Sequence, residues 1–349
     1  MLSIIIPVYN LEKFVVKCLE SLENQTNNYF ETIIINDGST DNSLGIIEDF
    51  LKKTSIKNVR LFSTSNKGVS EARNLGIRES SGDYLLFLDG DDYIESSLVE
   101  TIYMLKNNYD IIFFNHNFVD ETEYSVIKSS VNKLDKDSFS NECFIRNHLL
   151  TTRYFNLWIG SIVFSKRLLS SLNLQFISKL QTGEDTNFIS KCFLLAKKIK
   201  YIDMILSNYV QRSGSVTKRY NIRRFDSVYS YIDVANFISE NSYQIEPEYI
   251  NRILNKFYYL SIRSYIKSFF SLLVYFEDDT IKSRIESLMS EINQNYPLLE
   301  EEIRRISSKS KLEFTFFHIS TNIIYTVFKI SPRFAFQVYK IVNSFLYQP

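Results

Sequence analysis

Residues 84–92 read Y-L-L-F-L-D-G-D-D, an apolar run that ends in three carboxylates within four positions. The run has the length and composition of a buried strand. Asp89, Asp91 and Asp92 repel one another unless a cation lies among them, and hard ions such as Mg²⁺ and Mn²⁺ prefer oxygen ligands. The alternative is an acidic turn that begins the next helix, where carboxylates favour the positive end of the helix dipole. We expect Asp91 and Asp92 to contact a metal ion directly, and Asp89 to bind a ribose or bridge to the metal.

Similar short apolar runs lie on both sides of this strand, and helix-like stretches separate them. Strands that alternate with helices of this length predict an α/β fold, with a mainly parallel central sheet and helices on both faces. The predicted strands are 2–8, 32–35, 59–62, 84–88 and 111–114. The predicted helices are 11–24, 42–53, 67–79 and 96–106, with N-caps at Asn10, Asp41, Asn66 and Ser96.

Polar residues follow the predicted strands, and ligands of open α/β sheets bind at the carboxyl ends of the strands. Asp37, in N-D-G-S-T-D (36–41), can accept a hydrogen bond from a base or a ribose, although a turn with a helix cap explains the residues after it. Lys67 and Arg73 lie on the opening of a helix, where backbone N–H groups attract anions. Arg73 thus reaches a diphosphate or holds an aspartate of the 89–92 turn. A solvated helix face is the alternative for this segment.

The regular alternation weakens after residue 117. A polar stretch (118–140), a helix near 141–152, an aromatic segment around Trp158, a helix after T-G-E-D (182–185) and a strand near 199–210 follow. Beyond about residue 221 the apolar residues recur at helical spacing. The predicted helices there are 223–240, 248–274, 279–293 and 319–346. We therefore expect a catalytic domain at 1–220, with halves 1–117 and 118–220, and a helical C-terminal region at 221–349.

Composition and charge exclude several classes of function. The 349 residues carry 40 basic and 40 acidic side chains, and this zero net charge argues against nucleic acid as a partner. The three cysteines and three histidines are scattered, which argues against a structural zinc site and fits a reducing cytoplasm. The sequence shows neither a signal peptide nor an apolar run of about 18 residues. We expect a cytoplasmic protein that is soluble or lies on a membrane surface.

Four ordered motifs resemble one family. I-I-I-P-V-Y-N (4–10), I-N-D-G-S-T-D-N-S (35–43), N-K-G-V-S-E-A-R-N-L-G (66–76) and D-Y-L-L-F-L-D-G-D-D (83–92) are similar to the nucleotide-binding half of glycosyltransferase family 2, which has the GT-A fold. The resemblance covers residues 1–117. It implies a metal-dependent hexosyltransferase that uses a nucleotide-diphosphate sugar with Mn²⁺ or Mg²⁺.

The resemblance also implies roles for particular residues of this sequence. Asp89 and Asp91 match the ribose and metal positions of the D-x-D motif, and Asp92 matches a metal position in some members. Arg212, in Y-V-Q-R-S-G-S-V-T, resembles a residue of a late loop that contacts the diphosphate. The segments around the base and diphosphate supply the other donor-binding residues, which are Pro7, Val8, Tyr9, Asp37, Lys67, Gly68 and Arg73.

The acceptor half carries the implied catalytic base. T-G-E-D-T-N-F (182–188) resembles the family's E-D signature, so Asp185 is the expected general base and Glu184 lies beside it on the acceptor side. A helix cap is the alternative for this pair. Trp158 resembles the acceptor-side wall, with a core tryptophan as the alternative. A single displacement with inversion follows, in which Asp185 takes the proton from the acceptor hydroxyl.

The chain departs from the processive synthases of the family, which carry Q-x-x-R-W and membrane spans. Neither feature is present in the sequence, so transfer of a single sugar is expected. UDP-hexoses and UDP-N-acetylhexosamines are the implied donors. A glycan or lipid-linked oligosaccharide of capsule, O-antigen or other surface-polysaccharide synthesis is the implied acceptor. A sugar nucleotidyltransferase is the alternative enzyme, but P-V-Y-N replaces its glycine-rich phosphate loop after the first strand. A non-catalytic sugar-binding module needs no metal triad.

The C-terminal tail is basic and amphipathic. Residues 303–349 carry seven Lys or Arg residues and one acid among many aromatic and aliphatic residues. Such helices lie on an anionic membrane, or dock on the catalytic domain or on a second subunit. We expect a peripheral association with the inner face of the cell membrane, with a homo-oligomer as the other reading of the tail.

Overall fold

A computed structural model of the chain shows two compact units, the first of residues 1–179 and 184–215 and the second of residues 180–183 and 216–349. The structure describes residues 1–105, 109–132, 134, 138–140, 157–212, 220–241, 245–273, 275 and 281–309. The predicted helix near 141–152 and the predicted helix 319–346 lie outside these residues. So does nearly all of the basic tail.

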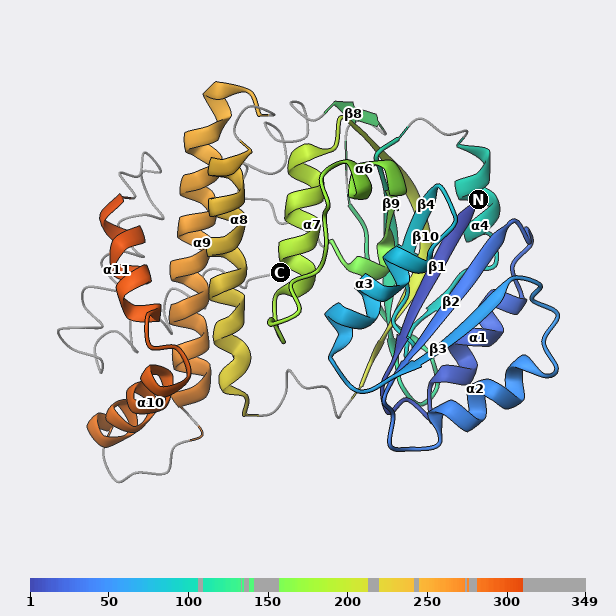
Figure 1. Ribbon diagram of the computed structural model, residues 1–349, viewed down its shortest axis with the longest axis horizontal. Helices are drawn as coiled ribbons and strands as arrows, with labels where there is room; N and C mark the ends of the chain where they lie inside the picture. Colours follow the sequence, from blue (N-terminus) through green and yellow to red (C-terminus); the bar gives the residue numbers. More distant parts are fainter. Residues whose placement is uncertain are drawn as a thin grey trace. The chain divides into compact units, whose positions relative to one another are not determined.

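A large, mostly parallel sheet forms the centre of the first unit (Figure 1). Its strands lie in the order β3-β2-β1-β4-β9-β6-β10-β5, with β7 paired to β6 and β8 paired to β10. The four strands β3, β2, β1 and β4 run parallel to one another, and β6 runs parallel to β10. The strands are β1 (Leu2–Val8), β2 (Phe30–Asp37), β3 (Val59–Thr64), β4 (Tyr84–Phe87), β5 (Tyr93–Ile94), β6 (Ile111–Asp120), β7 (Val126–Ser130), β8 (Ser138–Ser140), β9 (Ile162–Ser165) and β10 (Lys198–Gln211).

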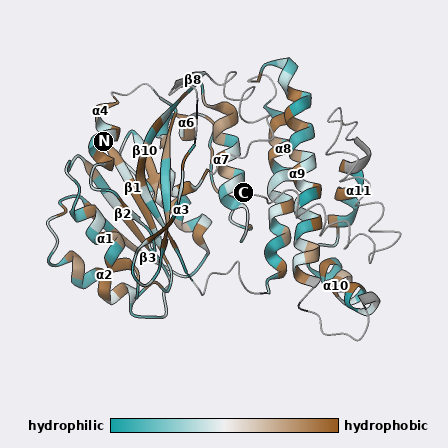
Figure 2. Ribbon diagram, turned by 180° about the vertical axis from the view of Figure 1, so that it is seen from behind, coloured by the Kyte–Doolittle hydropathy of each residue, from teal (hydrophilic) through white to brown (hydrophobic). Residues whose placement is uncertain are grey.

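Helices cover both faces of this sheet (Figure 1). One face carries α1 (Val15–Glu23), α2 (Ser43–Leu51) and α4 (Leu98–Met104), and the other carries α3 (Val69–Glu79), α6 (Lys166–Ser171) and α7 (Glu184–Leu195). A short 3₁₀ helix, η2 (Ile159–Ser161), precedes β9. The apolar residues lie mainly on the strands and on the helix faces that cover them (Figure 2). This is the predicted α/β arrangement.

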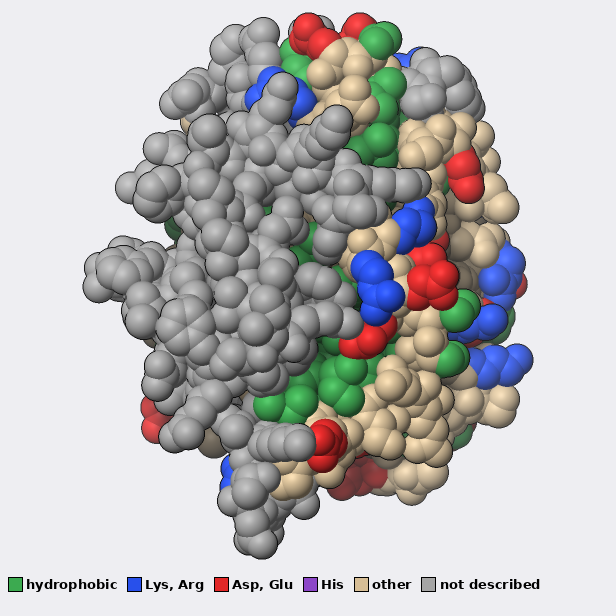
Figure 3. Space-filling view, turned by 90° about the vertical axis from the view of Figure 1, so that its left-hand side faces the viewer, with side chains coloured by type: hydrophobic (Ala, Val, Ile, Leu, Met, Phe, Trp, Pro, Cys, Tyr) green, Lys and Arg blue, Asp and Glu red, His purple; other side chains and the backbone are tan. Residues whose placement is uncertain are grey.

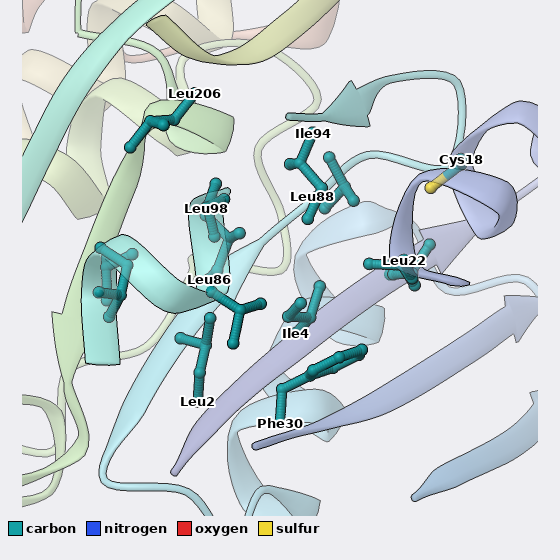
Figure 4. Close-up of a cluster of buried hydrophobic side chains, with 14 of the residues drawn as sticks. Leu2, Ile4, Cys18, Leu22, Phe30, Leu86, Leu88, Ile94, Leu98 and Leu206 are labelled. Carbon is teal, nitrogen blue, oxygen red and sulfur yellow. The ribbon is translucent and has the colours of Figure 1, made fainter. Parts of the chain in front are cut away.

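The β1 strand is buried on both faces, because its alternate side chains pack against different helices. Ile4 packs with Leu22 and Leu86 in the core cluster under α1 and α4 (Figure 4). Ile5 points the other way, toward α3, where a Cβ on Gly76 would lie 2.2 Å from Ile5 Cγ2. Only a glycine therefore lets α3 approach β1 this closely, and the helix holds Arg73 and Asn74 against the sheet.

Several sequence predictions were incomplete. The polar stretch 118–140 contains the strands β7 and β8, and the aromatic segment after Trp158 continues into β9 and α6. β7 was missed because a short, exposed strand lacks a continuous apolar run, and β9 was missed because its buried run is only four residues long. The predicted strand near 199–210 and the helix after T-G-E-D are confirmed as β10 and α7.

The predicted N-caps were wrong. The residues that precede α1, α2, α3 and α4 are Phe14, Asn42, Gly68 and Ser97. Asn10 and Asp41 bond across two loops instead: Asn10 Oδ1 accepts from Thr40 N at 2.8 Å, and Asp41 Oδ2 accepts from Glu12 N at 3.0 Å. Their side chains tie the β1 and β2 loops together, a tertiary use of capping residues that local spacing does not reveal.

The second unit is helical within its described part. After the 3₁₀ helix η4 (Ile222–Phe225) it contains α8 (Asp226–Glu240), α9 (Pro247–Leu273), α10 (Ile281–Asn295) and α11 (Leu299–Lys309). Their buried faces share a core that includes Phe225, Phe269, Ile292 and Ile303. The first three predicted C-terminal helices are confirmed, whereas α11 was not predicted. None of the helices in the described ranges is long and apolar enough to cross a membrane. On the described part of the face drawn in Figure 3, basic side chains lie beside acidic ones.

Candidate active site

The parallel strands β1, β2 and β4 bring their carboxyl ends to one edge of the sheet, which is where sequence spacing placed the site. Pro7 and Val8, at the end of β1, are buried, and Tyr9 is exposed. The Pro7 carbonyl accepts a hydrogen bond from Gly90 N at 3.3 Å. The acidic turn 89–92 is therefore fixed against the end of β1.

Asp37 lies at the end of β2 and is only 3% exposed. Its two carboxylate oxygens accept hydrogen bonds from the backbone N–H groups of Lys67 and Gly68, each at 2.8 Å. Gly38 follows with φ +69°, and a Cβ there would lie 2.5 Å from Asn66 N. Asp37 thus holds the loop that leads into α3, and the Lys67 side chain is left exposed.

Arg73, on the first turns of α3, joins the two acidic motifs. The residue is 2% exposed, and its Nη2 lies 2.7 Å from Asp89 Oδ1. Its Nη1 donates to Asp185 Oδ1 and lies 3.7 Å from Glu184 Oε1. One guanidinium therefore contacts carboxylates from two stretches of sequence that were predicted to serve the donor and the acceptor. The Phe176 ring lies beneath it, with its centroid 5.2 Å from Cζ.

The Asp185 carboxylate is carried on the first turn of α7. Phe188, one turn further along, packs against Phe87 of β4 at a ring-centroid distance of 5.6 Å and stacks on Phe176 at 3.9 Å. These buried contacts fix the rotation of α7 about its axis, and this rotation determines the direction of Asp185. The side chain of Asp185 remains 31% exposed, so a ligand can reach it.

Charge is unevenly distributed around Arg73, because three carboxylates face one guanidinium. Burial, and then the neighbouring Asp185, raises the pKa of Glu184 to about 8, while Arg73 opposes the rise. Burial also raises the pKa of Asp185, and Arg73 again opposes the rise. Protonated Glu184 leaves two carboxylates beside the guanidinium. The Asp185 carboxyl therefore holds a proton more tightly than an ordinary aspartate does.

Asp91 and Arg212 form the second ion pair of the site. Arg212 Nε lies 2.6 Å from Asp91 Oδ2, and the guanidinium lies over the Phe14 ring at 5.4 Å. Burial raises the pKa of Asp91 to about 6, although Arg212 counteracts it. The last residue of β10 directly precedes Arg212, so the strand delivers this cation to the acidic turn.

Asp92 points in a different direction from Asp91. It is 1% exposed, and its Oδ1 accepts a hydrogen bond from Val210 N of β10 at 2.7 Å. Burial and the Asp91 charge raise the pKa of the Asp92 carboxyl. The expected pair of direct metal contacts is thus divided in the structure: Asp91 faces Arg212, and Asp92 links the turn to β10.

Comparisons with known proteins bear on the family and the fold of this chain. The model of the glycosyl transferase family 2 matches residues 3–171. These residues are a family 2 glycosyltransferase domain. The domain and the region after it are 32% identical over 224 residues to the uncharacterized glycosyltransferase EpsJ of Bacillus subtilis strain 168, a match that covers 62% of this chain and 63% of EpsJ.

Solved structures show the fold of the family 2 domain. A crystal structure of Staphylococcus aureus TarS 1–349 in complex with UDP-GlcNAc superposes with a TM-score of 0.63 at 19% identity, covering 93% of this chain and 91% of that one. The mannosyltransferase PcManGT of Pyrobaculum calidifontis, in complex with GDP-Man and Mn²⁺, gives 0.52 at 12% identity, covering 88% and 84%. The chain has the GT-A fold, with a helical C-terminal part.

The oxygen donors of the family 2 domain suit a divalent cation that is shared with a diphosphate. The described residues contain no group of three or more His, Cys, Asp or Glu side chains arranged to hold a metal alone. Mg²⁺ and Mn²⁺ are commonly held by one or two carboxylates together with substrate phosphates. Asp91 and Asp89 provide such a partial set, so the residues present fit a metal that arrives with the nucleotide.

Trp158 belongs to an aromatic cluster that sequence reasoning found only in part. Its ring lies 5.2 Å from His116 and 5.3 Å from Tyr209, and Phe118 lies 5.5 Å from Tyr209. Burial lowers the pKa of His116 to about 4, so this histidine is neutral at pH 7. Burial raises the pKa of Tyr209 to about 12, and the charges of the acidic turn 89–92, with Asp92 the largest, add to the rise. The sequence carries no signal for these partners, because β6 and β10 pair only in the folded sheet.

Proposed function

We propose that this chain is an inverting glycosyltransferase that transfers one sugar from a nucleotide-diphosphate sugar to a hydroxyl of its acceptor. The observation that carries the proposal is the position of Arg73, whose guanidinium contacts both Asp89 of the D-x-D motif and Asp185 on α7. A donor site and a base within one ion-pair network suit a displacement at the anomeric carbon. The network does not favour a sugar nucleotidyltransferase, because that class of enzyme needs no general base for an acceptor hydroxyl.

Asp185 is the proposed general base, because its carboxylate is partly exposed and its pKa is raised. It takes the proton from the acceptor hydroxyl as that oxygen attacks the anomeric carbon, and the nucleotide diphosphate leaves from the opposite face. Glu184, protonated at neutral pH, donates a hydrogen bond to the acceptor beside the base. Trp158 with Tyr209 forms an aromatic wall for the acceptor sugar.

The donor binds at the carboxyl edge of β1, β2 and β4 in this proposal. Tyr9 lies against the nucleobase, and Asp89 binds the ribose. Arg212 gives up its ion pair with Asp91 and contacts the diphosphate instead. Asp37 acts through the backbone of Lys67 and Gly68, which it holds in place. The buried Pro7 and Val8 support this floor from beneath.

Asp91, with Asp89 beside it, would hold Mn²⁺ or Mg²⁺ together with the diphosphate. The metal when bound neutralises the charge that develops on the leaving nucleotide. We assign no direct metal contact to Asp92, because its carboxylate is committed to the backbone of β10. The proposed metal ligand is therefore Asp91, and Asp92 positions the turn.

The donor is proposed to be a UDP-hexose or a UDP-N-acetylhexosamine, since TarS was solved with UDP-GlcNAc. The acceptor is proposed to be a glycan or a lipid-linked oligosaccharide of surface-polysaccharide synthesis, such as capsule or O-antigen. TarS of S. aureus is named a poly(ribitol-phosphate) β-N-acetylglucosaminyltransferase, which supports an acceptor of the cell surface. Peripheral association with the inner face of the membrane completes the proposal. Liposome flotation of the full chain beside a chain that ends at residue 309, the last residue of α11, tests this association.

Release of free nucleotide from a panel of UDP-sugars and GDP-mannose, with Mn²⁺ or with EDTA, tests the activity. We expect metal-dependent release from one donor, and transfer when a suitable glycan is added. Asp185→Asn keeps the size of the side chain and should lower transfer at least about a hundredfold while UDP binding remains. The surface variant Asp49→Asn is the control. Equal transfer by the Asp185→Asn variant and the wild type would remove Asp185 as the base.

A further inference from the structure

Two successive residues of α3 bond to the part of the first unit that surrounds the proposed base. Arg73 contacts the Asp185 carboxylate directly. Asn74, the next residue, is 3% exposed and bonds instead to the backbone of Phe176. All four residues lie in the first unit, so the contacts between them are contacts within one compact body.

The Asn74 amide pairs with both polar groups of the Phe176 backbone. Its Nδ2 donates to the Phe176 carbonyl at 2.8 Å, and its Oδ1 accepts from Phe176 N at 2.8 Å. Phe176 follows α6, is buried, and lies outside the helices and strands, so its backbone groups need partners of another kind. A side-chain amide offers a donor and an acceptor together. Asn74 therefore holds Phe176 as a neighbouring strand would.

The ring of Phe176 lies between the sheet and α7. Its centroid is 5.0 Å from that of Phe87 on β4 and 3.9 Å from that of Phe188 on α7, and the Phe188 ring is stacked on it at 10°. All three rings are buried. The residue that Asn74 holds thus contacts both the strand that leads into the acidic turn and the helix that carries the base.

The stacked Phe188 is in turn connected to Asp185 through α7. The two residues are three positions apart in the helix, so their side chains are neighbours on its surface. A shift or rotation of α7 would move Asp185 and break the stack on Phe176 together. The other end of the connection is fixed, because Gly76 lets α3 pack closely against Ile5 of β1.

We propose that Asn74 is a positioning residue, which holds the Phe176 ring in place and through it sets the position of Asp185. The proposal rests on the assignment of Asp185 under the proposed function. The role is separate from the Arg73 ion pair, which constrains the Asp185 carboxylate, whereas the Phe176 stack constrains the helix that carries it. A displacement of a reacting group by about 1 Å can lower a rate about a hundredfold.

Asn74→Ala tests the proposal with a matched control, Asn115→Ala. Asn115 is also buried, and its amide also makes two bonds, from Nδ2 to Tyr201 Oη at 2.9 Å and from Asn132 N to Oδ1 at 2.9 Å. Hydrogen–deuterium exchange of a peptide that spans α7 is measured first, because it needs no substrate. We expect faster exchange in α7 for Asn74→Ala and wild-type exchange for Asn115→Ala. Unchanged exchange in Asn74→Ala overturns the proposal.

Phe176→Leu is the second variant. It keeps a buried apolar side chain and both backbone bonds to Asn74, so its folding does not depend on loss of the Asn74 amide. It removes the stack on Phe188, and it should therefore raise exchange in α7 as Asn74→Ala does. Wild-type exchange in Phe176→Leu would show that the ring does not hold the helix, and would overturn the proposal.

Kinetics with the active donor of the panel and its glycan acceptor separate positioning from folding. Asn74→Ala should lower kcat about tenfold or more, with the KM for the donor within about twofold of the wild type. In a chain that carries Asp185→Asn, the same substitution should lower the remaining kcat by less than about twofold, because the base is already lost. An equal loss in both backgrounds overturns the positioning role, since a general loss of folded protein acts with or without the base.

Failure of the proposed function gives a different result. Transfer that survives Asp185→Asn overturns the assignment of the base, whatever Asn74→Ala does to kcat. Exchange in α7 then still decides whether Asn74 holds the helix, because that measurement involves no reaction. The two failures are therefore distinguishable.

Discussion

The Arg212 guanidinium lies 2.6 Å from the Asp91 carboxylate, at the position where a cation would otherwise neutralise the acidic turn. The two residues come from distant stretches of the first unit, since Asp91 follows β4 and Arg212 follows β10. The pair keeps a buried carboxylate compensated before any ligand binds. Under the proposed function, Arg212 and a metal ion therefore compete for Asp91, and the diphosphate offers Arg212 another anion.

Removal of Arg212 should strengthen metal binding while it weakens catalysis. Without the guanidinium, Asp91 is free for a cation, so Arg212→Ala should bind Mn²⁺ about fivefold more tightly in the absence of nucleotide, as expected for an ion pair worth about 1 kcal/mol. Electron paramagnetic resonance of free Mn²⁺ measures this affinity. Arg167→Ala is the control, because that side chain is 77% exposed and pairs with Asp110. Weaker Mn²⁺ binding by Arg212→Ala would contradict the competition.

Asp91 and Asp92 should separate into different phenotypes. Asp91→Ala should abolish Mn²⁺-dependent nucleotide release with little change in the free energy of unfolding. Asp92→Ala leaves the buried Val210 N–H without its acceptor and should cost about 1–3 kcal/mol of that free energy. Urea denaturation and Mn²⁺ titration of both variants distinguish the roles. Stable Asp92→Ala protein that has lost Mn²⁺ binding would restore Asp92 as a direct metal ligand.

The sequence predicted the elements that are buried and regular, and it failed where tertiary contacts decide. The runs 2–8 and 84–88 are buried on both faces, so their apolar composition alone identified the strands β1 and β4. By contrast β7, with Val126 and Ile127 exposed, carries no such pattern. It forms because β6 offers a partner edge, and no local rule contains that information.

The candidate site shows the same division. Short motifs placed Asp37, Asp89 and Asp91 at strand ends, because parallel strands bring their carboxyl ends to one edge. The joining of Asp89 to Asp185 through Arg73 depends on how α7 packs on the sheet, which sequence spacing does not determine. The hydrogen bond between Asp92 and the β10 backbone could likewise not be predicted, since it depends on the register of a strand over a hundred residues away.

Gly38 and Gly45 provide a matched test of the β2 loop. In Gly38→Ala the alanine must adopt a left-handed backbone conformation, and its Cβ would lie 2.5 Å from Asn66 N. The substitution should therefore lower the free energy of unfolding by about 2 kcal/mol or more. Gly45→Ala lies within α2, where alanine is favoured by about 1 kcal/mol and only the end of the Asn42 side chain must move. It should be within about 1 kcal/mol of the wild type. Urea denaturation checks both, and equal effects would contradict the constraint at residue 38.

Glu184→Gln should change how stability depends on pH. Burial raises the pKa of Glu184 to about 8 in the folded chain, whereas an unfolded glutamate titrates near about 4.3. The folded state thus binds the proton more tightly, and the stabilisation from the neutral form is complete below the unfolded pKa and is lost as pH rises through 8. Glutamine stays neutral at every pH, so Glu184→Gln keeps that stabilisation.

The difference in Tm between Glu184→Gln and the wild type should therefore be small at pH 5 and should grow in favour of the variant up to pH 9. Calorimetry across this range measures it, with the exposed Glu48→Gln as the control that follows the wild type. The raised pKa of Asp91 acts in the same direction in both proteins, so the difference reports the Glu184 proton together with its interaction with the neighbouring Asp185. A Tm difference that is constant with pH would mean that Glu184 is ionised beside Arg73, and that the guanidinium balances three charged carboxylates.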